Sequence, residues 1–204
     1  MSLIGLMGGT FNPIHYGHLL IAQTVQDSLK LDKVIFIPNG TPPHKECPEF
    51  ISGKKRLEMI KLAIESNPLF EAYDTEIKET GKSYTVNTVK TLKKDFPNDS
   101  FVFITGIDAF IDYEWFNFEE LLELLDKFVT ASRPNFEIKQ FQEKLETIKN
   151  KNKILYLQTP LIEISSTDIR NRISAKRSIR YMLPDNVIDY IVKNKLYGSL
   201  NNYE

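Results

Sequence analysis

The chain has 204 residues, of which 42% are apolar and 26% charged, with a net charge of -1. That is enough apolar material for one α/β domain with a packed core, and it excludes wholesale disorder. The near-neutral charge argues against a large basic face for extended nucleic acid. The single cysteine, Cys47, excludes an internal disulfide framework and a multi-cysteine zinc module. With no signal-like leader and no uncharged apolar run of about 18 residues, we expect a cytoplasmic protein without membrane segments.

Short apolar runs alternate along the chain with stretches whose apolar residues recur at helical spacing. The first kind predicts strands or extended pieces at 2–7, 33–38, 69–77, 100–105, 127–131 and 153–158. The second kind predicts helices at 18–31, 53–66, 85–95, 118–125, 136–150, 166–174 and 184–195. Pro184 suits the first position of the last helix. A proline-rich stretch over 39–50 indicates a long loop, and such loops in compact domains are often functional.

This alternation predicts an α/β fold, a doubly wound and mainly parallel sheet that is covered on both faces and followed by a helical C-terminal tail. We expect residues 1–204 to form a single domain, with a C-terminal helical subregion over about 165–197. Ligands of such sheets bind at the carboxyl ends of the strands, where the connecting loops should converge. These are the loops after residues 7, 38, 105, 131 and 158.

The first of these loops combines glycines with two histidines. Gly8 and Gly9 let the backbone approach a ligand closely and take positive φ, and the helix that follows offers its N-terminus to an anion. His15 and His18 are three residues apart, so on a helical first turn their rings lie on one side, and Gly17 leaves room for a bulky group. A glycine turn with two incidental histidines is the alternative. The chain lacks the phosphate loops GxxxxGK[ST] and GxGxxG here, which disfavours P-loop NTPases and dinucleotide-dependent dehydrogenases.

Two segments carry a family resemblance. Residues 8–19, GGTFNPIHYGHL, resemble the first signature of the nucleotidyltransferase superfamily, and ISSTDIR at 164–170 resembles the second. Within the superfamily, bacterial nicotinate-nucleotide adenylyltransferases are similar in TPPHK at 41–45, SYTVNT at 83–88, GID at 106–108, Trp115 and the pair Arg133 and Pro134. The resemblance runs from residue 3 to 197. Asn12 stands where the bacterial pattern usually has aspartate, which weakens any role for a charge at that position.

The resemblance implies a Rossmann-like nucleotidyltransferase fold and an adenylyltransferase of NAD biosynthesis. Such an enzyme transfers AMP from ATP to nicotinate mononucleotide, giving nicotinate adenine dinucleotide and pyrophosphate, by in-line attack without a covalent intermediate. The attacking phosphate monoester has a second pKa of about 6 and is mostly a dianion at neutral pH, so no general base is required. We expect Mg2+ to enter with ATP. A nucleotidyltransferase acting on another phosphorylated acceptor is the main alternative, and a catalytically inactive nucleotide-binding regulator or a redox enzyme is less well supported.

The resemblance also implies the residues that hold ATP. His18 and His15 would be catalytic, with His18 donating a hydrogen bond to the α-phosphate. A helix start with hydroxyls and a guanidinium suits the β- and γ-phosphates, and residues 165–182 carry five basic residues against one acid. A solvated surface helix is the alternative for that stretch. The residues expected to bind ATP are Gly8, Gly9, Thr10, Phe11, His15, His18, Lys45, Gly106, Asp108, Ser165, Ser166, Thr167 and Arg170.

A second set of residues is assigned to the acceptor by the same resemblance. The residues expected to bind nicotinate mononucleotide are Thr85, Tyr84, Trp115, Lys45 and Arg133. N–H groups at the helix start near Thr85 would bind the nicotinate carboxylate, and Trp115 would stack on the pyridine ring. Core packing of Trp115, a helix N-cap role for Asp108 and a solvated Lys45 are the alternatives.

His44 and Cys47 raise a competing hypothesis for the histidines. Together with His15 and His18 they could supply four ligands to zinc. We disfavour zinc because His15 and His18 already lie in an anion-binding context, and we expect no resident metal. The expected partners are therefore ATP and nicotinate mononucleotide, with no extended nucleic acid and no membrane. The sequence leaves the oligomeric state open, a homo-oligomer included.

Overall fold

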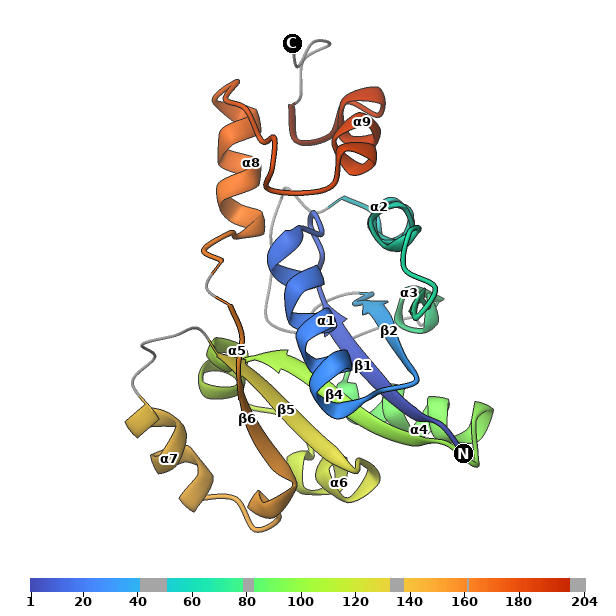
Figure 1. The fold of residues 1–204 in the computed structure, drawn as a ribbon, viewed down its shortest axis with the longest axis vertical. Coiled ribbons are helices and arrows are strands. Elements are labelled where there is room, and N and C mark those ends of the chain that lie inside the picture. Colours follow the sequence, from blue (N-terminus) through green and yellow to red (C-terminus); the bar gives the residue numbers. More distant parts are fainter. Residues whose placement is uncertain (41–50, 79–82, 133–137, 161, 199–204) are drawn as a thin grey trace.

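A computed structural model describes residues 1–40, 51–78, 83–132, 138–160 and 162–198 (Figure 1). Several residues singled out from the sequence lie outside these ranges, namely the TPPHK stretch at 41–45 with His44 and Lys45, and Cys47, Arg133 and Pro134. The statements below concern the described residues.

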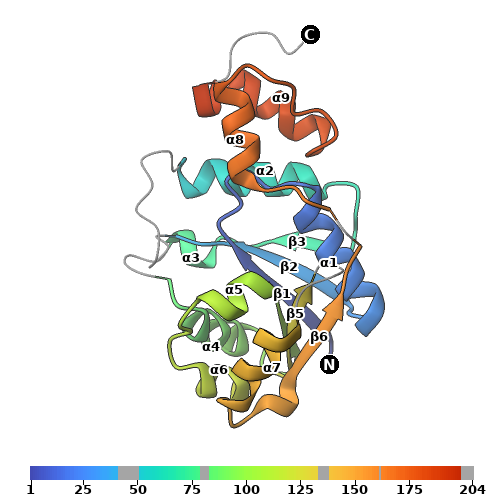
Figure 2. The same cartoon turned by 90° about the vertical axis from the view of Figure 1, so that its left-hand side faces the viewer.

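The described strands form one six-stranded sheet in the order β3-β2-β1-β4-β5-β6, and every neighbouring pair is parallel. Their bounds are β1 (Leu3–Gly9), β2 (Lys33–Pro38), β3 (Phe70–Ala72), β4 (Ser100–Gly106), β5 (Lys127–Ser132) and β6 (Ile154–Gln158). The chain builds outward from β1 through β2 to β3, then crosses back to start β4 on the other side of β1 (Figure 1 and Figure 2). The strand order thus reverses between β1 and β4, where open α/β sheets bind their ligands.

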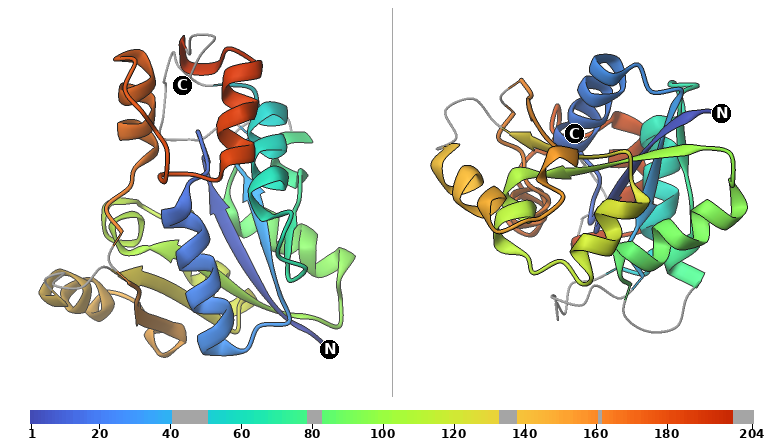
Figure 3. Two further views of the ribbon diagram at one scale, coloured as in Figure 1. Left: turned by 45° about the horizontal axis from the view of Figure 1, so that its top comes forward. Right: turned by 90° about the horizontal axis from the view of Figure 1, so that it is seen from below.

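Helices cover both faces of this sheet, as the sequence predicts. The helices are α1 (Tyr16–Leu29), α2 (Gly53–Ile64), α3 (Thr75–Lys78), α4 (Thr85–Asp95), α5 (Ile107–Asp112), α6 (Phe118–Leu124), α7 (Ile138–Glu146), α8 (Ser166–Ser174) and α9 (Asp185–Lys193). Two 3-10 turns are η1 (Lys151–Lys153) and η2 (Leu196–Gly198). Figure 3 shows the resulting layers from two further directions.

Alternate residues of the strands feed two separate apolar cores. On β2, Val34 and Phe36 pack with residues from α1, α2, α8 and α9, whereas Ile35 and Ile37 pack with residues from α4 to α7. All four of these side chains are buried. Burial on both faces explains why the strands read as continuous apolar runs rather than as alternating patterns. The two cores fix the strands in register, so their carboxyl ends meet at one edge.

The fold class and most element positions predicted from the sequence are confirmed. The stretch 69–77 is not extended throughout, because β3 ends at Ala72 and α3 follows from Thr75. β3 is an edge strand that pairs only with β2, so few hydrogen bonds would stabilise a longer strand. The prediction for Pro184 is wrong by one position, since it caps α9 from outside the helix with an extended ψ of 145°.

One glycine at the carboxyl edge permits a close contact between backbone segments. The N–H of Gly40 donates to Ser83 Oγ at 3.2 Å. A Cβ at position 40 would overlap the backbone carbonyl oxygen of Glu76. Residues 40 and 76 are therefore packed backbone against backbone near the end of β2, with the Ser83 side chain beside them.

We predict that Gly40→Ala destabilises the fold by about 2 kcal/mol, because backbone atoms cannot rotate away as a side chain could. Thermal unfolding followed by circular dichroism measures this loss. Gly106→Ala is the matched control, since a Cβ there meets no heavy atom within 4 Å. Equal unfolding temperatures for the two variants would contradict the assigned contact.

Candidate active site

A cavity of about 830 Å³ opens at the carboxyl edge of the sheet. Its wall contains residues at or just after the ends of β1, β2, β4, β5 and β6, namely Thr10, Asn39, Ile107, Ser132 and Thr159. The convergence of five loops predicted from the sequence is therefore confirmed. Figure 2 shows α8 standing beyond these strand ends. Segments far apart in sequence thus enclose one space.

Every candidate residue that lies within the described ranges lines this cavity. They are Gly8, Gly9, Thr10, Phe11, His15, His18, Tyr84, Thr85, Gly106, Asp108, Trp115, Ser165, Ser166, Thr167 and Arg170. Lys45 and Arg133 are the two candidates that lie outside the described residues. The structure thus brings the described part of both predicted substrate sets together in one site.

The loop between β1 and α1 turns at a residue that the sequence did not indicate. Gly8 and Gly9 permit positive φ but do not adopt it, because β1 continues through both in extended conformation. Phe11 takes the left-handed backbone instead, with φ 48°, and its ring is 1% exposed. Burial of the ring in the core beneath α1 offsets the cost of that conformation. We call residues 8–12 the phosphate loop, after the role expected of them from the sequence. This loop is anchored by an apolar side chain.

His15 and His18 lie against each other at the start of α1. Their ring centroids are 3.7 Å apart with an interplanar angle of 32°. A Cβ at Gly17 would lie 3.0 Å from His15 Nδ1, so the bulky group for which Gly17 leaves room is the His15 ring. The ring of Phe11 meets His18 edge-on at 5.0 Å. The pair is thus wedged between the helix backbone and the buried phenyl ring.

One hydrogen bond fixes the tautomer of His18. The backbone N–H of His15 donates to His18 Nδ1 at 3.3 Å. A neutral imidazole that accepts at Nδ1 carries its proton on Nε2. His18 is therefore a single-proton donor through Nε2–H, and the residue lines the cavity.

Both histidines are held neutral. Burial lowers the pKa of His15 to about 4, and His15 is 6% exposed. Dense packing also lowers the pKa of His18 well below its usual value, and the neighbouring His15 lowers it further. A charged imidazolium would be poorly hydrated in this position. The two histidines therefore offer hydrogen bonds rather than two fixed positive charges.

Helix α8, which begins within the ISSTDIR motif, contacts the loop between β1 and α1. Ser165 caps the helix by accepting from the N–H of Asp168 at 3.0 Å, and Ser166 Oγ donates to the carbonyl of Pro13 at 2.8 Å. Arg170 Nη1 donates to the carbonyl of Asn12 at 2.9 Å. Two segments about 150 residues apart are thus joined by direct hydrogen bonds, and a guanidinium stands beside the phosphate loop.

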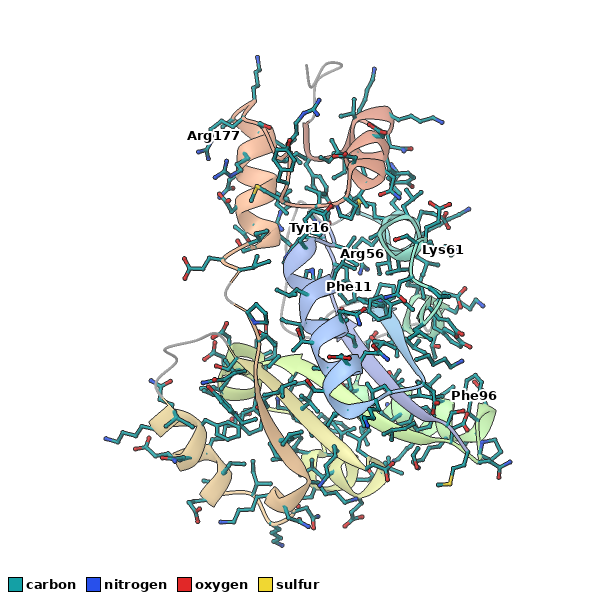
Figure 4. The ribbon with its side chains drawn as sticks, viewed as in Figure 1. Phe11, Tyr16, Arg56, Lys61, Phe96 and Arg177 are labelled. Atoms are coloured by element: carbon teal, nitrogen blue, oxygen red, sulfur yellow. The ribbon has the colours of Figure 1, made fainter. Side chains whose placement is uncertain are left out.

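The remaining basic residues of α8 and its following turn do not belong to the cavity. Arg172 Nε lies 2.9 Å from Asp168 Oδ2, an ordinary surface ion pair one helical turn apart. Lys176, Arg177 and Arg180 are exposed and absent from the cavity wall. Figure 4 shows Arg177 at the outer end of α8. The solvated-helix alternative therefore holds for these residues, whereas Arg170 faces the site.

The other half of the cavity is aromatic. Tyr84 precedes the first residue of α4, Thr85, so the N-terminus of that helix lies at the cavity wall. The ring of Phe116 lies 4.5 Å from that of Tyr84 and is half exposed at 52%. Trp115 packs at right angles to Phe128 at 5.1 Å while also lining the cavity. Both interpretations of Trp115, core packing and ligand contact, are therefore compatible with one position.

The most buried cation near the site was missed in the sequence. Arg56 in α2 is 1% exposed, and its guanidinium donates to a set of backbone carbonyls. The acceptors include Thr10 O at 2.7 Å, Asn39 O at 2.5 Å, Gly40 O at 3.3 Å and, from Nε, Ile51 O at 3.3 Å. Figure 4 places Arg56 and Phe11 close together at the end of β1. Nothing in the local pattern distinguishes this arginine from the solvated lysines beside it.

The described residues contain no group of three or more His, Cys, Asp or Glu side chains that could hold a metal ion. Asp108, exposed in the first turn of α5, lies on the cavity wall and could accept from a water bound to a nucleotide-associated metal. Two of the four ligands considered for zinc, His44 and Cys47, lie outside the described ranges. Among the described helices none has the length and apolarity required to cross a bilayer.

Comparison with known proteins agrees with this geometry. A family model described as cytidylyltransferase-like matches residues 6–172. A probable nicotinate-nucleotide adenylyltransferase of Desulfitobacterium hafniense (strain Y51) is 44% identical over 200 residues, which covers 95% of both chains. The nicotinate-nucleotide adenylyltransferase of Bacillus subtilis (strain 168) is 40% identical over 201 residues, covering 98% of this chain and 100% of that protein.

A solved structure supports the fold. Nicotinic acid mononucleotide adenylyltransferase of Plasmodium falciparum, in complex with NaAD, superposes with a TM-score of 0.79 at 23% identity, covering 99% of this chain and all of that one. Fold and site together define a nucleotidyltransferase. More narrowly, the chain belongs to the nicotinate-nucleotide adenylyltransferase family.

The lowered histidine pKa values predict that acid destabilises the fold. Between pH 6.5 and about 4 the unfolded chain protonates His15 while the folded chain does not, so stability present above pH 6.5 is lost as pH falls. For His15 alone the loss at pH 5 is about 2 kcal/mol. Thermal unfolding of wild type and His15→Gln between pH 8 and 5 measures it. The variant should lose less stability on acidification, and parallel curves would show that His15 is not held neutral.

Proposed function

We propose that this chain transfers AMP from ATP to nicotinate mononucleotide, releasing pyrophosphate and nicotinate adenine dinucleotide. The observation that carries this proposal is the meeting of the phosphate loop with α8, where Arg170 donates to Asn12 beside the neutral pair His15 and His18. The names of relatives at 40–44% identity support the same reaction. The reaction joins two anionic substrates, so the site must bring phosphates together and neutralise the charge that develops.

The α-phosphate is the reacting centre, and His18 is the residue that we assign to it. Its Nε2–H would donate a hydrogen bond to a nonbridging oxygen of that phosphate. This hydrogen bond would strengthen as negative charge builds up on the oxygen in the transition state. A phosphate monoester with a second pKa of about 6 attacks without a general base. His15 and the backbone of residues 8–12 would hold the rest of the triphosphate. The reaction therefore requires that the two substrates be positioned and that the developing negative charge be compensated, and it does not require an activated side chain.

The leaving pyrophosphate is assigned to the start of α8. Ser165 and Ser166 begin that helix, and Thr167 Oγ1 accepts from Arg170 Nη2 at 3.3 Å. A helix N-terminus with nearby hydroxyls and a guanidinium suits a polyphosphate. ATP would arrive as its magnesium complex, which reduces the charge that Arg170 must compensate. Lys45 remains a proposed further contact to the triphosphate.

The acceptor is assigned to the aromatic half of the cavity. N–H groups at the start of α4, near Tyr84 and Thr85, would bind the nicotinate carboxylate, and Trp115 would face the pyridine ring. Nicotinamide mononucleotide has no carboxylate and gains less from these donors. Arg133 remains a proposed further contact to the acceptor. We also propose a cytoplasmic location, where ATP is plentiful and a lone cysteine stays reduced.

Pyrophosphate release from ATP and magnesium tests the function. We predict rapid release with nicotinate mononucleotide, much slower release with nicotinamide mononucleotide, and almost none without an acceptor. The His18→Ala variant is the control for the site, and its turnover should fall by about 10²- to 10³-fold because one transition-state donor is removed. Absence of release with both acceptors would refute the reaction, and preference for the amide would refute the role of α4.

A further inference from the structure

The extreme C-terminal turn of the described chain returns to the phosphate loop. After α9 the chain enters η2 and runs between α8 and α9 (Figure 1). There the hydroxyl of Tyr197 donates to Asn12 Oδ1 at 2.7 Å, a contact between residues 185 positions apart. Asn12 is 3% exposed and lines the cavity. A residue outside the two sequence motifs thus holds a residue inside the first one.

The backbone around Tyr197 is shaped for this contact. Lys195, Tyr197 and Gly198 all have positive φ, at 49°, 56° and 74°. Left-handed conformation is unfavourable for a bulky residue such as tyrosine, and it persists where the surroundings require it. Leu196, between them, is 3% exposed and anchors the turn in the core. The tight turn reverses the chain and directs the Tyr197 hydroxyl toward residue 12.

The surroundings of the Tyr197 hydroxyl keep it protonated, so it remains a hydrogen-bond donor. Burial raises the pKa of Tyr197 far above its usual value, although the nearby cations Arg170 and Arg56 oppose that shift. The phenol is therefore protonated at all working pH values. Its acceptor is the side-chain oxygen of Asn12, while the main-chain oxygen of the same residue accepts from Arg170 at 2.9 Å. Asn12 is thereby held at two points by the C-terminal part of the chain.

We infer that Tyr197 is a positioning residue for the nucleotide site, which holds the phosphate loop against α8 through the side chain of Asn12. This inference rests on the proposed function for its kinetic readout. It also gives Asn12 a task that requires an oxygen acceptor but no negative charge. Asparagine and aspartate can both perform it, so the asparagine at this position is compatible with an active site.

Tyr197→Phe removes the hydroxyl and keeps the ring. We expect KM for ATP to rise and kcat/KM for ATP to fall about tenfold, because the loop loses the attachment made through the side chain of Asn12. KM for the acceptor should stay unchanged. Tyr190→Phe in α9 is the matched control, since it makes the same chemical change on a partly buried tyrosine that is not on the cavity wall. It should behave like the wild type.

A double-mutant cycle separates positioning from general stabilisation. In an Asn12→Leu background, which has no acceptor, Tyr197→Phe should change kcat/KM for ATP less than twofold, whereas in an Asn12→Asp background the tenfold effect should remain. Equal effects of Tyr197→Phe in all three backgrounds would overturn the inference. A lowered unfolding temperature with an unchanged KM for ATP would overturn it as well.

Hydrogen–deuterium exchange supplies a readout that does not depend on the reaction. Backbone amides of residues 8–12 should exchange faster in Tyr197→Phe than in wild type or Tyr190→Phe, because the loop opens more often. Unchanged exchange there would overturn the positioning role. If wild-type protein releases no pyrophosphate with either acceptor, the proposed function fails, and the exchange result still decides the role of Tyr197.

Discussion

The buried guanidinium of Arg56 holds together the ends of the two strands on which the site is built. It bonds the carbonyl of Thr10 after β1 and those of Asn39 and Gly40 after β2. Burial lowers the pKa of Arg56, while the nearby groups Tyr197 and Glu76 raise it. Removing a guanidinium from water costs several kcal/mol, and only a dense set of acceptors offsets that cost. Because those acceptors are backbone carbonyls, the positions of both loops depend on this one side chain.

The hydrogen bonds of Arg56 help to explain how a site made of loops can be rigid. Arg56 holds the loop from behind, Phe11 anchors it in the core, and Arg170 and Ser166 hold it from α8. Phosphoryl transfer gains most from such preorganisation, since bonds that are already in place need not form during the reaction. The neutral histidines fit the proposed reaction, because they would donate hydrogen bonds to charge that develops on the phosphates and carry no positive charge beforehand.

The sequence predicted the sheet and most helices, because strands buried on both faces and amphipathic helices are local signals. The two long motifs also picked out residues that the fold brings to one cavity wall. The sequence missed what depends on contacts between distant segments. Arg56 looks like any basic residue of an amphipathic helix, and only the packed structure shows that it is buried. The contact of Tyr197 with Asn12 spans 185 positions and follows no pattern. The left-handed turn occurs at Phe11 rather than at the glycines, because core packing of its ring outweighs local backbone preference.

In the proposed reaction, His18 donates a hydrogen bond to the α-phosphate and does not attack it. The stereochemical course at that phosphorus tests this most directly, using a single diastereomer of adenosine 5′-O-(1-thiotriphosphate) with nicotinate mononucleotide as acceptor. Direct in-line transfer between the two substrates inverts the configuration, which is the result that this account predicts. Retention would require two successive displacements and a covalent enzyme intermediate, and it would contradict the assigned role of His18.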